Sequence, residues 1–172
     1  MTEKVAPDWE RIEAERKSLL PEDVPIGVER DLVRLFMESF QCGIMEDRIP
    51  LASTDTIILE MSVRYGRADI VVFHTDGTAS VIEAKDGSKG YNHVVSGIGQ
   101  AALYAVQIAQ TKGAVKRVRK CLMWTSAGDV EVDAAIEGAC EAASVIPMPW
   151  PSMRILMSTG EAVRRVMGVG VQ

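Results

Sequence analysis

Three polar side chains that lie close together in the sequence can support metal-assisted chemistry. Asp69 opens one apolar run, and Glu83 and Lys85 lie two residues apart in the next run. The dipeptide Asp76-Gly77, a turn signal, stands between the two runs. Carboxylate oxygens are the ligands that hard divalent cations prefer, and such a cation activates water and holds a phosphate oxygen. We therefore interpret this hairpin as a metal-dependent phosphodiesterase site.

The length of the hairpin loop decides whether the two carboxylates can meet. Side chains alternate between the faces of a strand, so a two-residue turn would place Asp69 opposite Ala84 and the two acids on opposite faces. A loop of three or five residues, or a bulge, places Asp69 opposite Glu83 or Lys85. The interpretation as a metal site therefore predicts an odd loop or a bulge.

Each residue of the predicted site has an expected role. Asp69 and Glu83 would bind the cation together with the backbone carbonyl of Ala84. Lys85 would stabilise charge on the phosphate or orient the attacking water.

Two helices are expected to add further polar groups. Gln100 and Tyr104 lie one turn apart on a helix expected at 93–110. Gln100 would position a water or a phosphate, and Tyr104 would form a hydrogen bond nearby. Glu29 lies at the edge of the apolar face of a helix expected at 26–41. It either points at the site as a further acid and metal ligand, or complements the dipole of its own helix.

Hydrophobic periodicity predicts the elements that must position these residues. A segment at 145–146 would begin a strand that the run PMPWP interrupts, and 154–157 would be extended. The remaining expected elements are helices at 8–20, 26–41, 93–110, 130–143 and 161–167 and strands at 54–64, 69–73, 80–85 and 116–125. This order predicts an α/β fold with a mixed central sheet flanked by helices. We divide the chain into an N-terminal helix and linker, 1–25, and one domain, 26–172.

The order of elements and the site residues resemble the PD-(D/E)XK nuclease superfamily over about residues 26–125. Asp69 matches the first metal acid of that superfamily, and Glu83-Ala84-Lys85 matches its (D/E)xK triplet. The resemblance implies a restriction-endonuclease-like fold with an αβββαβ core. It also implies a Mg²⁺-dependent DNA nuclease, with Mn²⁺ as a substitute, in DNA repair, recombination or phage DNA metabolism.

Two further signatures resemble different branches of the superfamily. Gln100-x-x-x-Tyr104 is similar to the extra motif of the exonuclease branch. Gly27 with Glu29-Arg30 is similar to the helix-borne acid of archaeal Holliday-junction resolvases and related phage nucleases. The choice between an endonuclease and an exonuclease therefore stays open. The chain departs from the pattern at Ala68, where Pro is common, and it lacks the cysteine cluster of some exonucleases.

Charge is distributed unevenly along a chain with a net charge of −5. Residues 1–60 carry 14 acids and 7 bases, whereas residues 61–172 carry 10 acids and 12 bases. The basic cluster 112–120 holds five bases and no acid, and is either a solvated segment or a phosphate-contacting patch. The residues that we expect to contact DNA are Arg67, Lys89, Lys116 and Arg117.

The remaining composition excludes several classes of protein. No apolar run reaches the roughly 20 residues of a membrane span, and the N-terminus is too polar for a signal peptide, which predicts a cytoplasmic protein. Cys42, Cys121 and Cys140 form no CxxC pair and are expected to be reduced structural thiols.

Partners and alternative functions stay open at this stage. The N-terminal helix would pack either on the domain or on a partner subunit, so a homodimer and a protein partner for the acidic N-terminal third are both hypotheses. The alternative functions are a non-catalytic nucleic-acid-binding or assembly module on the same fold, and a plain structural domain whose polar residues are solvated.

Overall fold

The computed structural model of this 172-residue chain describes residues 6–24, 29–42, 49, 51–111, 113 and 115–168. The side chains of 21 and 38–42 are outside the description, so the prediction for Cys42 falls outside it, as does that for Gly27.

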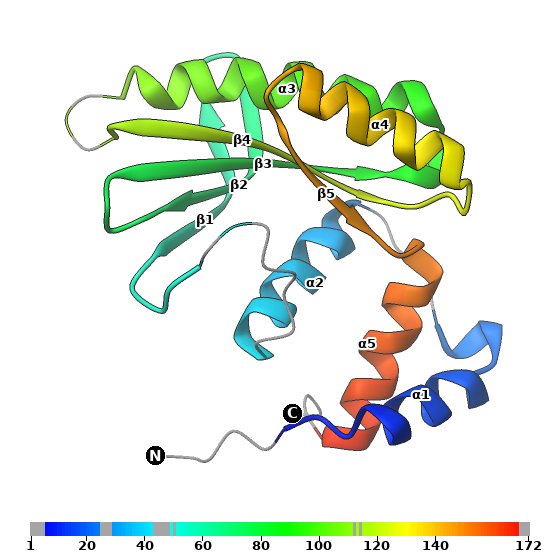
Figure 1. The fold of residues 1–172 in the computed structure, drawn as a ribbon. Coiled ribbons are helices and arrows are strands. Elements are labelled where there is room, and N and C mark those ends of the chain that lie inside the picture. Colours follow the sequence, from blue (N-terminus) through cyan, green and yellow to red (C-terminus); the bar gives the residue numbers. More distant parts are fainter. Residues whose placement is uncertain are drawn as a thin grey trace.

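A five-stranded mixed sheet in the order β1-β2-β3-β4-β5 forms the centre of the molecule (Figure 1). The β1–β2 and β2–β3 pairs are antiparallel, and the β3–β4 and β4–β5 pairs are parallel. The strands are β1 Thr56–Val63, β2 Gly66–Phe73, β3 Thr78–Asp86, β4 Arg117–Thr125 and β5 Ile146–Trp150. The predicted α/β class with a mixed sheet is confirmed.

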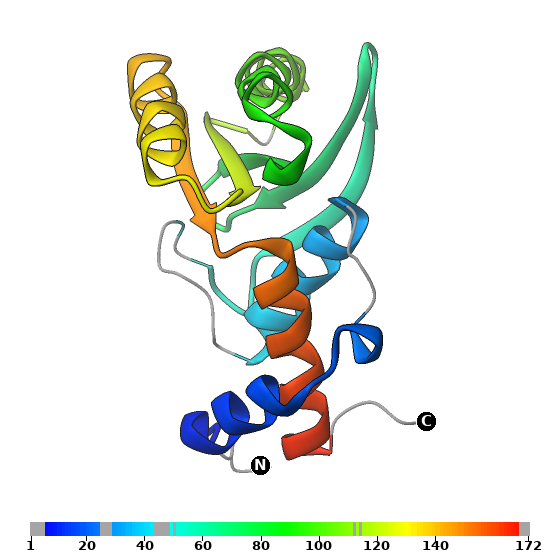
Figure 2. The same ribbon diagram turned by 90° about the vertical axis from the view of Figure 1, so that its right-hand side faces the viewer.

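Helices cover both faces of this sheet (Figures 1 and 2). Helices α3, Tyr91–Ala109, and α4, Val130–Ala142, lie on one face, and α2, Glu29–Cys42, lies against the other. A short 3-10 helix η2, Gly87–Lys89, joins β3 to α3. From α2 to β4 the order is αβββαβ, as the superfamily resemblance implies.

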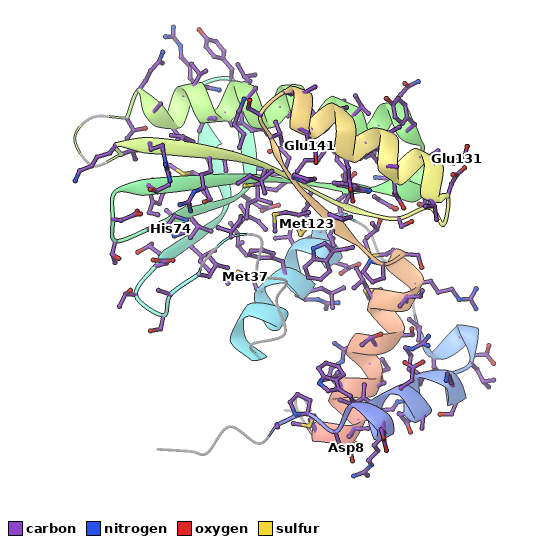
Figure 3. The ribbon with its side chains drawn as sticks, viewed as in Figure 1. Asp8, Met37, His74, Met123, Glu131 and Glu141 are labelled. Atoms are coloured by element: carbon purple, nitrogen blue, oxygen red, sulfur yellow. The ribbon has the colours of Figure 1, made fainter. Side chains whose placement is uncertain are left out.

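The alternation of side chains along β3 explains why both faces are covered. All nine residues of β3 are buried, as expected for a central strand covered on both sides. Ile82 and Ala84 pack in the layer between the sheet and α2, where Figure 3 also shows Met37 and Met123. Val81 packs on the opposite side with α3. Glu83 and Lys85 share the face of Val81, so alternation alone brings two charged side chains under α3.

The prediction that prolines interrupt the last strand is wrong. Strand β5 continues through Pro147 and Pro149 to Trp150 and pairs with β4 in parallel. Because β5 is an edge strand, its alternate residues Pro147 and Pro149 direct their missing N–H groups away from β4. Met148 between them still pairs opposite Met123.

The prediction of an extended segment at 154–157 is also wrong, because this segment lies in helix α5, Met153–Met167. The side-chain hydroxyl of Ser152 caps the helix by accepting from the Ile155 N–H at 3.4 Å. Met153 and Met157, one helical turn apart, are both buried against the core. The short helix expected at 161–167 is therefore the C-terminal half of a longer one.

The N-terminal helix α1, Trp9–Ser18, packs on α5 of the domain, which is one of the two arrangements considered for it. A short 3-10 helix η1, Pro21–Asp23, follows it. The carboxylate of Asp8 caps α1 by accepting from the Arg11 N–H at 3.1 Å. Arg165 of α5 forms ion pairs with Glu15 at 3.4 Å and Asp23 at 3.7 Å. Within the described part of the chain, no helix is long and apolar enough to cross a membrane.

Candidate active site

Three residues, 75–77, form the hairpin loop between His74, which follows β2, and Thr78, the first residue of β3. His74 N–H donates to the Thr78 carbonyl at 2.8 Å, and Gly77 N–H donates to the His74 carbonyl at 3.1 Å. Gly77 has a φ of 85°, a left-handed conformation that three-residue hairpin loops commonly require at this position. The predicted odd loop is therefore confirmed.

The strand register brings the two predicted metal acids to the same level. Ile70 pairs opposite Ile82, so Asp69 faces Glu83 one position further along the hairpin. The ladder between β2 and β3 ends at the Ile70–Ile82 pair, and beyond it the Ala84 N–H donates to Asp69 Oδ2 at 2.8 Å. A carboxylate thus takes the place of a backbone acceptor at the point where the two strands separate.

The opposite side of β2 is also distorted at this level. The β1–β2 pairs run from Leu59–Ile70 to Met61–Ala68 and skip Glu60 and Asp69. Glu60 has a φ of 50°, which a non-glycine residue rarely adopts. Asp69 is therefore free of regular pairing on both sides, as strands often are next to functional sites.

The strand register also sets the direction of the Ala84 backbone groups. In a strand the N–H and the C=O of one residue point to the same side. Because the Ala84 N–H points to Asp69, the Ala84 carbonyl points to the same side, where β2 no longer pairs with it.

Glu83 and Lys85 are buried beneath α3, with exposed fractions of 2% and 7%. Lys85 Nζ lies 3.7 Å from Glu83 Oε2.

Lys85 passes under Gly97 of α3, where an added Cβ would lie 3.2 Å from Lys85 Cε and 2.5 Å from Leu122 Cδ1. Gly97 therefore makes room for the lysine, and the sequence analysis missed it. The available signal was a glycine inside a helical pattern, which costs about 1 kcal/mol and marks close packing.

Burial sets the electrostatics of the two acids. Burial, and next the charge of Asp69, raise the pKa of Glu83 to about 8, although Lys85 opposes the shift. Burial also raises the pKa of Asp69, against the Ala84 N–H and Lys85, which favour its charged form. Without a cation the pair therefore retains a proton at neutral pH, because two neighbouring buried carboxyls do not both ionise readily.

Two buried oxygen atoms at this level have no hydrogen-bond partner among the described residues, Glu83 Oε1 and Gln100 Oε1. Gly97 lies over Lys85, and Tyr104 packs with Val81, so Gln100 between them lies at the level of Glu83. A buried acceptor without a partner costs about 1–3 kcal/mol. Both oxygens are therefore suited to bind a cation or a water that is not part of the chain.

Tyr104 lies one turn beyond Gln100 in a mainly apolar environment. It is 7% exposed and packs with Ala68, Val71 and Val81. Its hydroxyl lies against Gly66, where an added Cβ would come within 2.5 Å of the oxygen. The structure thus brings Gln100 to the level of the acids, whereas the described contacts of Tyr104 support the β1–β2 hairpin.

Glu29 reaches the site from the first residue of α2. Its Oε1 atom accepts a hydrogen bond from His93 Nε2 and one from the Asp86 N–H at 3.3 Å, and lies 3.5 Å from Lys89 Nζ. Burial alone would raise the pKa of Glu29, but the bonds from His93 and Asp86, with the charge of Lys85, hold it below its ordinary value. Sequence reasoning missed His93, whose only signal was its place in the helix that follows the E-x-K triplet.

The structure separates the four cations that were expected to contact DNA. Lys89 lies beside Glu29, and Arg67 lies 3.6 Å from Glu60. Lys116 and Arg117 lie at the other end of the sheet, since Arg117 pairs with Thr78, the first residue of β3. Lys85 lies seven positions after Thr78, which is about 23 Å along a strand.

The donor atoms present fit a hard divalent cation. Asp69 and Glu83 offer carboxylate oxygens, one of them buried and unpaired, and Ala84 offers a carbonyl. Among the described residues, no group of three or more His, Cys, Asp or Glu side chains is arranged as a metal cluster. Mg²⁺ commonly takes only one or two protein carboxylates and keeps several waters, so this small donor set suits it.

Comparisons with protein-family models and with curated proteins found no match. Among solved structures, a repair endonuclease from Pyrococcus abyssi is 17% identical with a TM-score of 0.47, over 73% of this chain and 47% of that chain. A chain of an EndoMS–dsDNA2 complex is 12% identical with a TM-score of 0.46, over 74% and 47%. The present chain thus spans about half the length of each.

The order of elements from α2 to β4 is the order that the sequence resemblance implies. The αβββαβ core places Asp69 on the second strand and Glu83-Ala84-Lys85 at the end of the third. The element order and the positions of these residues therefore agree with what that resemblance implies.

Proposed function

We propose that this chain is a metal-dependent DNA nuclease that hydrolyses phosphodiester bonds. The observation that carries the proposal is the meeting of Asp69, Glu83 and Lys85 at the end of β3, with an unpaired buried oxygen on Glu83. The choice of DNA, and of a role in DNA repair, recombination or phage DNA metabolism, follows from the superfamily resemblance and is proposed with it.

In the proposed site the chain holds and orients the reacting groups. Asp69, Glu83 and the Ala84 carbonyl, with Glu29, would bind Mg²⁺ or Mn²⁺. Such a cation, when bound, lowers the pKa of a coordinated water and polarises a phosphate oxygen. Lys85, buried beside Glu83, supplies positive charge toward the phosphate, and Gln100 Oε1 is available to accept a hydrogen bond from a water.

The test is cleavage of single-stranded, duplex, flapped and four-way DNA with Mg²⁺ or Mn²⁺, against EDTA. Lys85→Ala protein is compared with Lys17→Ala, which changes an exposed lysine on α1. We expect metal-dependent cutting that Lys85→Ala reduces at least 100-fold, on the order of a lost electrostatic stabiliser, and that Lys17→Ala leaves unchanged.

The outcomes separate the remaining alternatives. The preferred DNA would distinguish end processing from junction cutting. Salt-dependent DNA binding without cutting, by folded protein in either metal, would overturn the nuclease and support the non-catalytic module. A homodimer, proposed because cutting both strands at one place needs two sites, is checked by light scattering.

A further inference from the structure

Two helices on opposite faces of the sheet are joined at the candidate site by one pair of side chains. Helix α2 lies under the sheet and α3 above it (Figure 2). Their first turns meet beside the end of β3, where His93 Nε2 is hydrogen-bonded to Glu29 Oε1 across 64 positions of sequence. Both side chains are about 30% exposed, so this pair beside the candidate site is partly accessible to solvent.

The described contacts of the Glu29 carboxylate all fall on one of its two oxygens. His93, the Asp86 N–H and Lys89 all approach Oε1. Within the described part of the chain, Oε2 has no such contact. The carboxylate also interacts electrostatically with Lys85 and Asp69, so it belongs to the same charge cluster as the proposed metal acids.

Of the three groups on Oε1, His93 is best suited to fix the carboxylate. The Asp86 N–H is at 3.3 Å, a long hydrogen bond, and Lys89 is 47% exposed with a flexible side chain. The imidazole has only two rotatable bonds. It stands in the first turn of α3, where the His93 N–H is itself bonded to the Gly90 carbonyl at 3.1 Å.

We propose that His93 is a positioning residue that holds Glu29 by Oε1, so that Oε2 is available to a divalent cation at the Asp69–Glu83 pair. This inference rests on the proposed function. Residues that orient metal ligands typically change metal affinity about 10–100-fold when they are removed. His93 would therefore set metal affinity although it does not itself bind the metal.

Mn²⁺ binding to the full chain, measured by calorimetry without DNA, tests this proposal. We expect His93→Ala to weaken binding about tenfold or more. His93→Gln, whose amide nitrogen reaches the place of Nε2, should restore most of it, and Asn92→Ala, an exposed neighbour, should bind as the unchanged protein does. Equal affinity in His93→Ala, or no recovery in His93→Gln, would overturn the proposal.

A second measurement does not depend on metal. Urea unfolding in EDTA compares His93→Ala in the unchanged chain and in a Glu29→Ala background. We expect His93→Ala to lower the urea midpoint in the unchanged chain but not in the Glu29→Ala background, because Glu29, the partner of His93, is already removed there. An equal loss in both backgrounds overturns the proposal. If the unchanged chain neither binds Mn²⁺ nor cuts DNA, the proposed function fails. If the unchanged chain does both but the His93 variants do not differ from it as expected, this inference alone is overturned.

Discussion

The two ends of the central sheet each carry a histidine paired with a carboxylate, and the two pairs differ in what surrounds them. At the start of β3, where Figure 3 labels His74, its Nδ1 lies 2.8 Å from Asp55 Oδ2 and its Nε2 lies 2.8 Å from Ser80 Oγ. At the end of β3, His93 meets Glu29 beside Asp69 and Glu83.

At the His74 end the polar groups of this network are satisfied. The side chains of His74 and Asp55 are 7% and 3% exposed, and Asp55 also accepts from the Ala52 N–H at 3.0 Å. Burial alone would raise the pKa of Asp55, but the bonds from Ala52 and His74 hold it below its ordinary value. A satisfied buried network rigidifies the structure around it, here the segment before β1 and the β2–β3 hairpin.

At the Glu83 end the hydrogen bonding of the buried polar side chains is incomplete. Glu83 Oε1 and Gln100 Oε1 are buried without a partner among the described residues, and Glu83 keeps its proton to about pH 8. The comparison shows that a buried carboxylate beside a histidine is not by itself a sign of function. Unfilled hydrogen-bonding capacity is the feature that distinguishes the candidate site.

The largest expected effect is the loss of catalysis in Glu83→Gln. The amide keeps the size of the side chain but removes a metal ligand, so cleavage should fall about 1,000-fold, several kcal/mol of transition-state stabilisation. Cleavage rates and Mn²⁺ calorimetry on the same preparation check this. Wild-type rates in Glu83→Gln would remove the distinction between the two ends.

The matched change at the other end, His74→Ala, should affect stability and not metal binding. It removes the His74 partner of the buried Asp55 and Ser80 side chains, which should lower the free energy of unfolding by about 2–4 kcal/mol. Urea unfolding measures the loss, and Mn²⁺ affinity of the folded variant should stay within about twofold. A marked loss of affinity would show that the two ends are coupled.

Gly97→Ala tests the packing that brings Lys85 beneath α3. Alanine favours a helix, but its Cβ would come within 2.5 Å of Leu122, so α3 must move away from the sheet. We expect a net destabilisation of about 1–3 kcal/mol and a loss of cleavage. Gly99→Ala, where an added Cβ meets nothing within 4 Å, is the control and should be neutral or stabilising. Equal melting temperatures for the two variants would contradict this account.

The pH dependence of stability gives the smallest effect. The folded pKa of Glu83 is raised from 4.5 to about 8, so the folded state binds more protons than the unfolded state between these values. The contribution of Glu83 to the free energy of unfolding therefore becomes less favourable as pH rises from 4.5 to about 8. In EDTA, Glu83→Gln should raise the melting temperature by about 2 °C or more at pH 8.5, and by less at pH 5. A gain in melting temperature that is larger at pH 5 than at pH 8.5 would contradict a raised pKa of Glu83 in the folded state.

Much of this arrangement was predictable from local sequence. Apolar alternation and turn signals predicted the strands of the hairpin, and the interpretation of Asp69 and Glu83 as partners predicted the odd loop. Asp8 and Asp129 stand immediately before α1 and α4, where both carboxylates accept backbone N–H bonds. These features depend on residues near one another in the chain, so their information is local.

Other features were decided only by the tertiary structure. Pro147 and Pro149 are compatible with a strand only because β5 lies at the sheet edge, and Lys116 is distant from Lys85 only because β3 and β4 are parallel. Gly97 and His93 acquire their contacts through the packing of α3. The sequence by itself determined which chemical groups are present and which elements carry them. The tertiary structure decided which groups meet, because register and packing between distant segments set those distances.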